Sequence, residues 1–362
     1  MKRPQQGTRL LRATLVTPLS GSLAPFGRAC ANGLTLWARH AAQLPPPWTG
    51  VELDVYDLGS DMAAGLQAAL NTRPDILFGP YGSNTMLAMA RATQRTIWNH
   101  GGATSRLSLP EFPQVINVLS PASTYFVGVL QAVRAFDPVA TTVSLFHATT
   151  GFGRDVAGGA IKAASELQFK LQSISFKPQQ AATMAHTVPD ADVLLVVGNF
   201  ADELAVATPL LTRKWRASAF VGAGVEEVLA PLGKLREGLL GPAQWISTAA
   251  LEADEGPNVD WFVKNYKKMV GDDPPYPAAQ AFAAGLLCAR CLRDSGCCED
   301  ADQLAAARQL ECNTLYGAFR IDPQSGLQAA HQVLIVQWQD GERRVVWPPE
   351  QAERPLLVPF NQ

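Results

Sequence analysis

Short apolar segments alternate with stretches of helical apolar spacing along the first part of the chain. Residues 10–17 form an apolar run, and residues 51–58 alternate Val, Leu and Val with Glu, Asp and Tyr, as a half-buried strand does. Residues 28–42 repeat apolar positions at helical spacing, and residues 62–71 follow the capping pair Ser60 and Asp61. This strand–helix order predicts a parallel sheet covered by helices.

The stretch from residue 74 to residue 104 predicts a compact β–turn–α–β unit. Its strands are expected at residues 76–78 and 96–98, with a helix from Ser83 to about residue 95 between them. Both strands end in glycine turns, and the carboxyl edge of an open parallel sheet is where ligands bind. Two roles are open to Ser83: capping the helix, or turning its hydroxyl toward an anionic ligand.

A second series of the same type begins with a helix at residues 124–135, after an expected strand near residues 118–124. Two series of like architecture in 362 residues predict two α/β lobes. Later patterns predict helices at 259–270 and 278–294, and Asp340-Gly341 is typical of a hairpin turn. The other expected elements of the second series are strands at 142–146, 169–175, 193–197 and 219–221, and helices at 153–167 and 202–211.

The composition is that of a folded globular chain, with 47% hydrophobic residues, 17% charged residues and a formal net charge of -2. No block of basic residues indicates nucleic acid as a partner. No apolar run is long enough to cross a membrane. The first residues are basic but lack the apolar region of a secretory signal, which leaves the compartment open between an exported and an intracellular protein.

Five of the six cysteines lie between residues 288 and 312. Cys288 and Cys291 stand three residues apart on an alanine-rich helix, where cysteine behaves as a small core residue, so we expect no metal site. A disulfide between Cys312 and Cys297 or Cys298 is expected if the protein is exported.

The chain contains no nucleotide-binding, nucleophile-elbow or metallohydrolase motif, and its five histidines are scattered, so we expect neither an enzyme nor a cofactor. Six strand-end loops instead combine glycine and small hydroxyl residues, most with one aromatic residue. Backbone N–H groups and hydroxyls suit a carboxylate, and aromatic rings suit an apolar ligand body. These loops therefore predict a binding cleft for a small carboxylate or zwitterion.

Several motifs stand in the order of one known family: Pro-Leu-Ser-Gly-Ser-Leu-Ala-Pro-Phe-Gly (18–27), Phe-Gly-Pro-Tyr-Gly-Ser (78–83) and Trp-Asn-His-Gly-Gly-Ala (98–103). Over residues 10–347 the chain resembles the type I periplasmic binding proteins, in the leucine/isoleucine/valine-binding branch of ABC transport. The resemblance implies a monomer of two Rossmann-like lobes, residues 9–120 with 248–330 and residues 121–247 with 331–362. The lobes would be joined by three hinge crossings and close on a ligand between them.

The resemblance also implies a function and a site. A solute receptor outside the cytoplasm would deliver its ligand to a membrane permease; the alternative is a cytoplasmic sensor of amides or amino acids on the same fold. Ser83 matches the serine that binds the ligand carboxylate, and Gly101, Gly102, Ala103 and Thr104 match a second loop for carboxylate and amine. The acid that pairs with the ligand ammonium aligns with Gly224, which leaves Glu226 as an open substitute and an aromatic acid or amide as competing ligands. The remaining expected site residues are Phe26, Tyr81, Gly82, Phe152, Phe200 and Tyr276.

Overall fold

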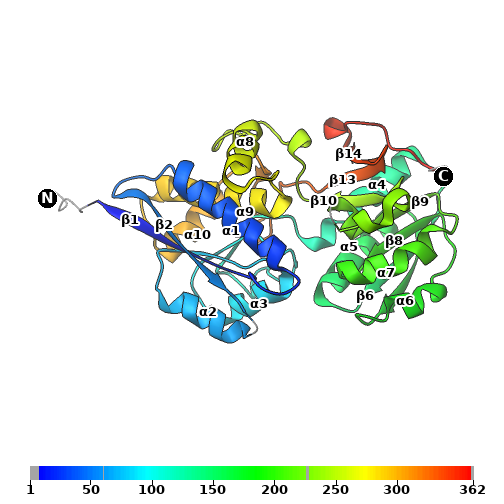
Figure 1. The fold of residues 1–362 in the computed structure, drawn as a ribbon, viewed down its shortest axis with the longest axis horizontal. Helices are drawn as coiled ribbons and strands as arrows, with labels where there is room; N and C mark the ends of the chain where they lie inside the picture. Colours follow the sequence, from blue (N-terminus) through cyan, green and yellow to red (C-terminus); the bar gives the residue numbers. More distant parts are fainter. Residues whose placement is uncertain (1–7, 60, 226–227, 360–362) are drawn as a thin grey trace. The chain divides into compact units, whose positions relative to one another are not determined.

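The structure, a computed structural model, describes residues 8–59, 61–225 and 228–359. The chain divides into two compact units, unit 1 (Met1–Ser120 with Ala250–Gln332) and unit 2 (Pro121–Ala249 with Val333–Gln362). Each unit is a sheet with helices packed against it (Figure 1). The predicted α/β fold with parallel sheets is confirmed.

Unit 1 is built on a five-stranded sheet in the order β2-β1-β3-β4-β5, and all neighbours are parallel. Its strands are β1 (Arg9–Thr17), β2 (Trp48–Asp57), β3 (Ile76–Phe78), β4 (Ile97–Asn99) and β5 (Val115–Asn117). A small antiparallel pair, β11 (Cys312–Thr314) with β12 (Gly317–Phe319), lies apart from this sheet. The helices are α1 (Ala24–His40), α2 (Met62–Asn71), α3 (Ser83–Ala92), α8 (Val259–Val270), α9 (Tyr276–Ser295) and α10 (Asp300–Gln309).

Unit 2 has a seven-stranded sheet in the order β14-β13-β10-β9-β8-β6-β7. The strands from β10 to β7 are parallel, whereas β13 and β14 form an antiparallel hairpin at one edge. The strands are β6 (Thr142–Ala148), β7 (Lys170–Phe176), β8 (Val193–Val197), β9 (Ala217–Phe220), β10 (Leu240–Ala243), β13 (Leu334–Gln339) and β14 (Glu342–Trp347). The helices are α4 (Val127–Phe136), α5 (Gly151–Glu166), α6 (Ala181–Met184) and α7 (Phe200–Leu211), with 3₁₀ turns that include η1 (Ala122–Thr124), η3 (Val221–Gly224) and η4 (Ala230–Arg236).

Most element predictions agree with these bounds, and the differences have local causes. The strand expected near residues 118–124 is wrong: β5 ends at Asn117, and a 3₁₀ turn precedes α4. Helix α1 begins at Ala24, four residues earlier than expected. Pro25 suits its first turn, because a proline lacks the N–H group that would have no partner there, and no polar cap marks this start in the sequence. The hairpin turn is confirmed, since Asp340 and Gly341 both have positive φ, 56° and 79°.

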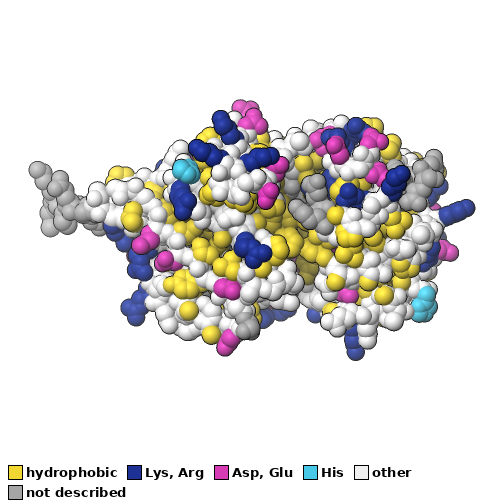
Figure 2. Space-filling model, viewed as in Figure 1, with side chains coloured by type: hydrophobic (Ala, Val, Ile, Leu, Met, Phe, Trp, Pro, Cys, Tyr) yellow, Lys and Arg dark blue, Asp and Glu magenta, His cyan; other side chains and the backbone are white. Residues whose placement is uncertain are grey.

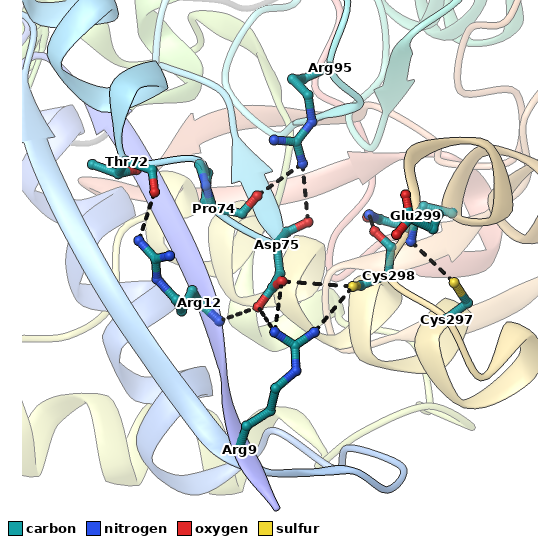
Figure 3. A network of polar contacts seen from close by, with 10 residues as sticks. Arg9, Arg12, Thr72, Pro74, Asp75, Arg95, Cys297, Cys298 and Glu299 are labelled. Atoms are coloured by element: carbon teal, nitrogen blue, oxygen red, sulfur yellow. Dashed lines mark hydrogen bonds and ion pairs between the residues drawn. The ribbon is translucent and has the colours of Figure 1, made fainter. Parts of the chain in front are cut away.

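Helix α10 was not predicted from the sequence, and an ion pair fixes its start. Arg95 Nε donates to Asp300 Oδ2 at 2.7 Å, and its Nη2 donates to the Pro74 carbonyl at 2.9 Å. Asp75 accepts from Arg9 and from the Arg12 N–H, and the Cys298 thiol also donates to it (Figure 3). This network joins the segment before α10 to the start of β3.

All six cysteines carry free thiols, so the structure has no disulfide between Cys312 and Cys297 or Cys298. In the ranges that the structure describes, no three His, Cys, Asp or Glu side chains gather as a metal site would require. The helices of these ranges are too short or too polar to span a bilayer. Basic and acidic side chains are interspersed on the face drawn in Figure 2.

Helix α9 packs on α1 through a glycine contact that leaves no room for a side chain. A Cβ atom at Gly285 would lie 2.4 Å from Trp37 Cδ2, and Trp37 is fully buried. Alanine is a better helix former than glycine by about 1 kcal/mol, but overpacking a core costs about 1–3 kcal/mol. We expect Gly285→Ala to lower the free energy of unfolding, measured by urea denaturation.

Gly158 on α5 provides the control, because a Cβ atom there would meet nothing within 4 Å. Gly158→Ala is expected to raise the free energy of unfolding by about 0.5–1 kcal/mol through helix propensity alone. Equal shifts for the two variants would contradict the close contact at Gly285.

Candidate functional site

Three neighbouring strands of unit 1 end beside one another and carry most of the predicted site. Strands β1, β3 and β4 are adjacent and parallel, so the segments that follow them start from one edge of the sheet. Phe26 follows β1 on the first turn of α1. Residues 81–83 follow β3, and residues 101–104 follow β4. The fold of unit 1 thus brings these predicted residues to a common edge.

Three of the predicted aromatic residues contact one another. The rings of Phe26 and Tyr81 stack with centroids 5.0 Å apart and an interplanar angle of 7°. Tyr276 is the first residue of α9, and its ring centroid lies 6.4 Å from that of Phe26 and 6.5 Å from that of Tyr81. The two tyrosine hydroxyls are hydrogen-bonded. All three side chains are partly exposed. We call them the aromatic group of unit 1.

Ser83 does not cap α3. The N-cap residue is Gly82, with φ of 104°, and Ser83 is the first helical residue. The first helical hydrogen bond runs from the Met86 N–H to the Gly82 carbonyl at 3.0 Å, so the N–H groups of Ser83 and Asn84 lie ahead of it. Capping is therefore left to the backbone, and the partly exposed Ser83 hydroxyl stands beside N–H groups of the kind that bind anions.

The N–H groups of Gly101 and Gly102, residues that the resemblance assigns to the carboxylate and amine loop, already have an acceptor within unit 1. Asn99 Oδ1 accepts both of them, at 3.3 and 2.8 Å, and Asn99 Nδ2 donates to the Gly102 carbonyl at 2.8 Å. The Gly82 N–H donates to the Gly101 carbonyl at 2.9 Å. The two glycines are needed for space, since a Cβ atom at Gly101 would lie 2.6 Å from Tyr81 Cα. These contacts join the loop after β4 to the loop after β3.

The second half of this loop is buried. Ala103 and Thr104 have exposed fractions of 7% and 2%. Thr104 Oγ1 accepts from the Arg106 N–H at 3.3 Å. His100 is also buried, and both of its ring nitrogens lack a hydrogen-bond partner among the described residues. Burial lowers the pKa of His100 to about 4, so the ring is neutral at physiological pH and supplies no positive charge for a carboxylate.

The predicted residues of unit 2 follow adjacent strands in the same way. Phe152 lies on the first turn of α5 after β6, and Phe200 begins α7 after β8. Thr150 and Asn199 cap these helices through their side chains. Phe152 packs edge-on against Tyr125, with centroids 5.8 Å apart.

Tyr125 was not predicted as a site residue, although it belongs to the same edge of unit 2. Its hydroxyl accepts from Gln244 Nε2 at 3.0 Å. Burial raises the pKa of Tyr125 to about 12, and the charge of Asp155 adds to the rise. Asp155 stands three residues after Phe152 on α5. A carboxylate is therefore close to the Phe152–Tyr125 pair.

Gly224 leaves no space for the acid that the resemblance places there. A Cβ atom at Gly224 would lie 1.8 Å from the Pro242 carbonyl oxygen, and Arg343 Nη1 donates to the Gly224 carbonyl at 2.6 Å. Glu226, the open substitute, lies outside the described residues. Strand β10 therefore occupies the space that the side chain of the expected acid would need.

A buried acid stands nearby on α7. Glu203 is fully buried and accepts from the N–H groups of Gly198, at 3.2 Å, and Gly222, at 2.6 Å. Burial raises the pKa of Glu203 to about 8, against the lowering effect of these two hydrogen bonds.

Unit 2 also has a cavity of about 590 Å³, which is separate from these residues. Its lining includes Asp192, Trp215, Arg216 and Glu237. Asp192 and Arg216 immediately precede β8 and β9, so the cavity lies at the amino ends of the strands, the other end of the sheet from Phe152 and Phe200. Arg216 is paired with Asp137, at 2.6 and 2.9 Å.

A family model described as periplasmic binding protein matches residues 11–343. The chain belongs to the periplasmic binding protein family. The predicted resemblance is therefore confirmed, and this periplasmic binding protein can be compared with solved structures of the same fold.

Three solved structures illustrate the likeness. The leucine binding protein LivK from Thermotoga maritima is 17% identical with a TM-score of 0.77, and the match covers 93% of this chain and 97% of that one. An ABC transporter solute binding protein from R. palustris, in complex with benzoate, is 15% identical with a TM-score of 0.75, covering 97% and 98%. A third, from Rhodopseudomonas palustris HaA2 in complex with p-hydroxybenzoic acid, is 17% identical with a TM-score of 0.77, covering 97% of each chain.

The sequence analysis of this periplasmic binding protein missed Asn99, Tyr125 and Glu203. Asn99 had a usable signal, because an asparagine at a strand end before two glycines can satisfy their N–H groups. Glu203 had none, since its second partner, Gly222, is 19 residues away in the 3₁₀ turn after β9.

Removing the Asn99 side chain tests whether it holds the loop after β4. Asn99→Ala leaves the N–H groups of Gly101 and Gly102 without their acceptor in a buried place, which costs about 1–3 kcal/mol. We expect the free energy of unfolding to fall by that amount in urea denaturation. The exposed Asn84→Ala is the control and should change it by less than about 0.5 kcal/mol. A loss at Asn99 no greater than at Asn84 would contradict the role.

Proposed function

We propose that this protein is the solute-binding receptor of an ABC transporter and that its ligand is a small aromatic carboxylate. The observation that carries the proposal is the pairing of Ser83, at the amino end of α3, with the aromatic group of unit 1. A carboxylate suits the Ser83 hydroxyl and the N–H groups of Ser83 and Asn84. A ring suits the partly exposed faces of Phe26, Tyr81 and Tyr276.

The neighbours support the ligand class. Solute binding proteins of this fold bind benzoate, 4-hydroxybenzoate and 3,4-dihydroxybenzoic acid. The closed position at Gly224 supports a ligand without an ammonium group, because a desolvated ammonium without a partner costs several kcal/mol. We propose that unit 2 contributes Phe152, Phe200 and the Gly224 loop to binding. In this proposal the protein acts as a monomer outside the cytoplasm, carries out no catalysis and delivers its ligand to a membrane permease.

An amino acid is the second candidate ligand, and one observation favours it. The carboxylate of Asp155 lies close enough to Tyr125 to raise its pKa, so an acid is present at the edge of unit 2 where Phe152 stands. LivK, a neighbour of the same fold, is a leucine binding protein. If leucine binds, we expect Asp155→Asn to weaken it tenfold or more and to leave benzoate affinity unchanged, as measured by titration calorimetry.

Calorimetry of the Ser83 variant tests the main proposal. We expect benzoate and 4-hydroxybenzoate to bind the wild type, and Ser83→Ala to weaken them by about 1–3 kcal/mol because a hydrogen bond to a charged group is lost. Asn84→Ala, one residue along the same turn, keeps its backbone N–H group and serves as the control. Unchanged affinity in Ser83→Ala would remove Ser83 from the site.

A panel of ligands tests the class itself. Benzoate, benzamide and leucine are compared at equal concentration by thermal shift, where the midpoint rises with ligand concentration over dissociation constant. A shift with benzamide that exceeds the shift with benzoate, together with recovery of the native protein from the cytosolic fraction, would favour the intracellular sensor instead.

A further inference from the structure

The chain leaves unit 1 twice, after Ser120 and after Gln332, and enters it again after Ala249. We call residues 117–120 and 326–332, which lead up to the two departures, the exit segments of unit 1. Both segments lie within unit 1 and within the described residues. Contacts between them therefore act on both chain connections that begin in unit 1.

Two side-chain amides join the exit segments. Asn117 Nδ2 donates to the Gly326 carbonyl at 2.9 Å, and Gln328 Nε2 donates to the Val118 carbonyl at 3.2 Å. Both amide side chains belong to buried residues, so water does not compete for these bonds. The two segments are therefore held beside one another inside unit 1 before they reach their ends.

A serine and a histidine make the last contact before the chain leaves unit 1. Ser120 Oγ donates to the His331 carbonyl at 2.9 Å and lies 2.6 Å from His331 Nδ1. A hydroxyl has one hydrogen, which the carbonyl receives here, so the serine oxygen accepts from Nδ1 and the ring carries a proton on that nitrogen. Both residues are buried. Two hydrogen bonds thus join the end of one exit segment to the end of the other.

The histidine ring also connects this contact to the helix that begins at Tyr276. His331 stacks on Tyr316, with centroids 4.2 Å apart and an interplanar angle of 9°. The Tyr316 hydroxyl accepts from Gln280 Nε2 at 3.0 Å. Gln280 stands four residues after Tyr276 on α9, so the two residues share one face of that helix. A continuous series of contacts therefore runs from α9 to both exit segments.

We propose that Ser120 and His331 are positioning residues for ligand binding, because their bonds hold the two exit segments together and connect them to the helix of Tyr276. The part that concerns the ligand rests on the proposed function. In that function residues of both units take part in binding, so the segments that join the units have to be ordered when the ligand is bound. Segments that are already held in the free protein need less ordering on binding, which favours affinity.

Hydrogen exchange of the ligand-free protein tests the contact between the exit segments. The amides of Val118, Ala329 and Ala330 report on it, because each of them donates a hydrogen bond from within these segments. We expect Ser120→Ala to raise their exchange rates by about tenfold. Ser144→Ala is the control, because it also removes a buried hydroxyl, one that donates to a carbonyl of unit 2 at 2.8 Å, and it should leave these rates unchanged.

Two substitutions of His331 separate the hydrogen bond from the ring. Asparagine and glutamine both remove the ring that stacks on Tyr316, but only asparagine carries its amide nitrogen as many bonds from Cα as Nδ1 is. His331→Asn should therefore keep the exchange rates of the wild type, and His331→Gln should raise them as Ser120→Ala does. Equal rates in the two His331 variants, or wild-type rates in Ser120→Ala, would overturn the positioning role.

Calorimetry with benzoate tests the effect on binding. We expect Ser120→Ala and His331→Gln to raise the dissociation constant about fivefold, because the exit segments then have to be ordered on binding. Ser144→Ala loses a buried hydrogen bond elsewhere and should leave the constant unchanged, which separates positioning from a general loss of stability. Wild-type affinity in Ser120→Ala, together with faster exchange, overturns the part that concerns the ligand.

The connection to α9 has its own variant. Tyr316→Phe keeps a ring for His331 to stack on but loses the hydroxyl that accepts from Gln280. It should weaken benzoate and leave exchange in the exit segments as in the wild type, and unchanged affinity would overturn this connection. If benzoate does not bind the wild type, the proposed ligand class fails, and the exchange measurements alone decide whether Ser120 and His331 hold the segments.

Discussion

Backbone N–H groups at the carboxyl ends of parallel strands need partners, and each unit supplies them from one buried side chain. In unit 1 the amide of Asn99 accepts from Gly101 and Gly102. In unit 2 the carboxyl group of Glu203 accepts from Gly198 and Gly222. A buried N–H group without an acceptor costs about 1–3 kcal/mol, so these two side chains decide which loop conformations are stable. They also decide which N–H groups remain for a ligand.

The same constraint explains why Ser83 is the better candidate within unit 1. Gly101 and Gly102 look like an anion-binding loop in the sequence, yet their N–H groups are already used by Asn99. The turn at Gly82 adopts a positive φ that lets the backbone cap α3, and Thr85 donates its hydroxyl to the Tyr81 and Gly82 carbonyls at 2.7 Å. The Ser83 side chain is therefore not used to cap the helix that it begins.

The alternation of apolar runs with helical spacing was enough to predict parallel strands in both units, because such patterns report burial directly. It predicted strand 76–78 and helix 259–270 with their observed bounds. It missed α10, whose sequence has little amphipathic character and whose first residue is fixed by Arg95, about two hundred positions away. The candidate site was likewise predicted only in part. Phe26, Tyr81 and Tyr276 were identified one by one, but only the fold shows that their rings touch.

Gly224 has no room for a side chain, which shows why a residue matched to a family position is a weak guide to ligand chemistry. A side chain there would overlap the Pro242 carbonyl, so the backbone of η3 itself, rather than a lost acid, fills the place beside β10. Glu203 does not replace that acid, because it is fully buried and both of its oxygens already accept backbone N–H groups. A charge partner for an ammonium group would have to come from another element, and Asp155 on α5 is an acid close to the aromatic pair of unit 2. Under the proposed function, Asp155 is therefore the residue whose substitution distinguishes an amino acid from an aromatic acid as the ligand.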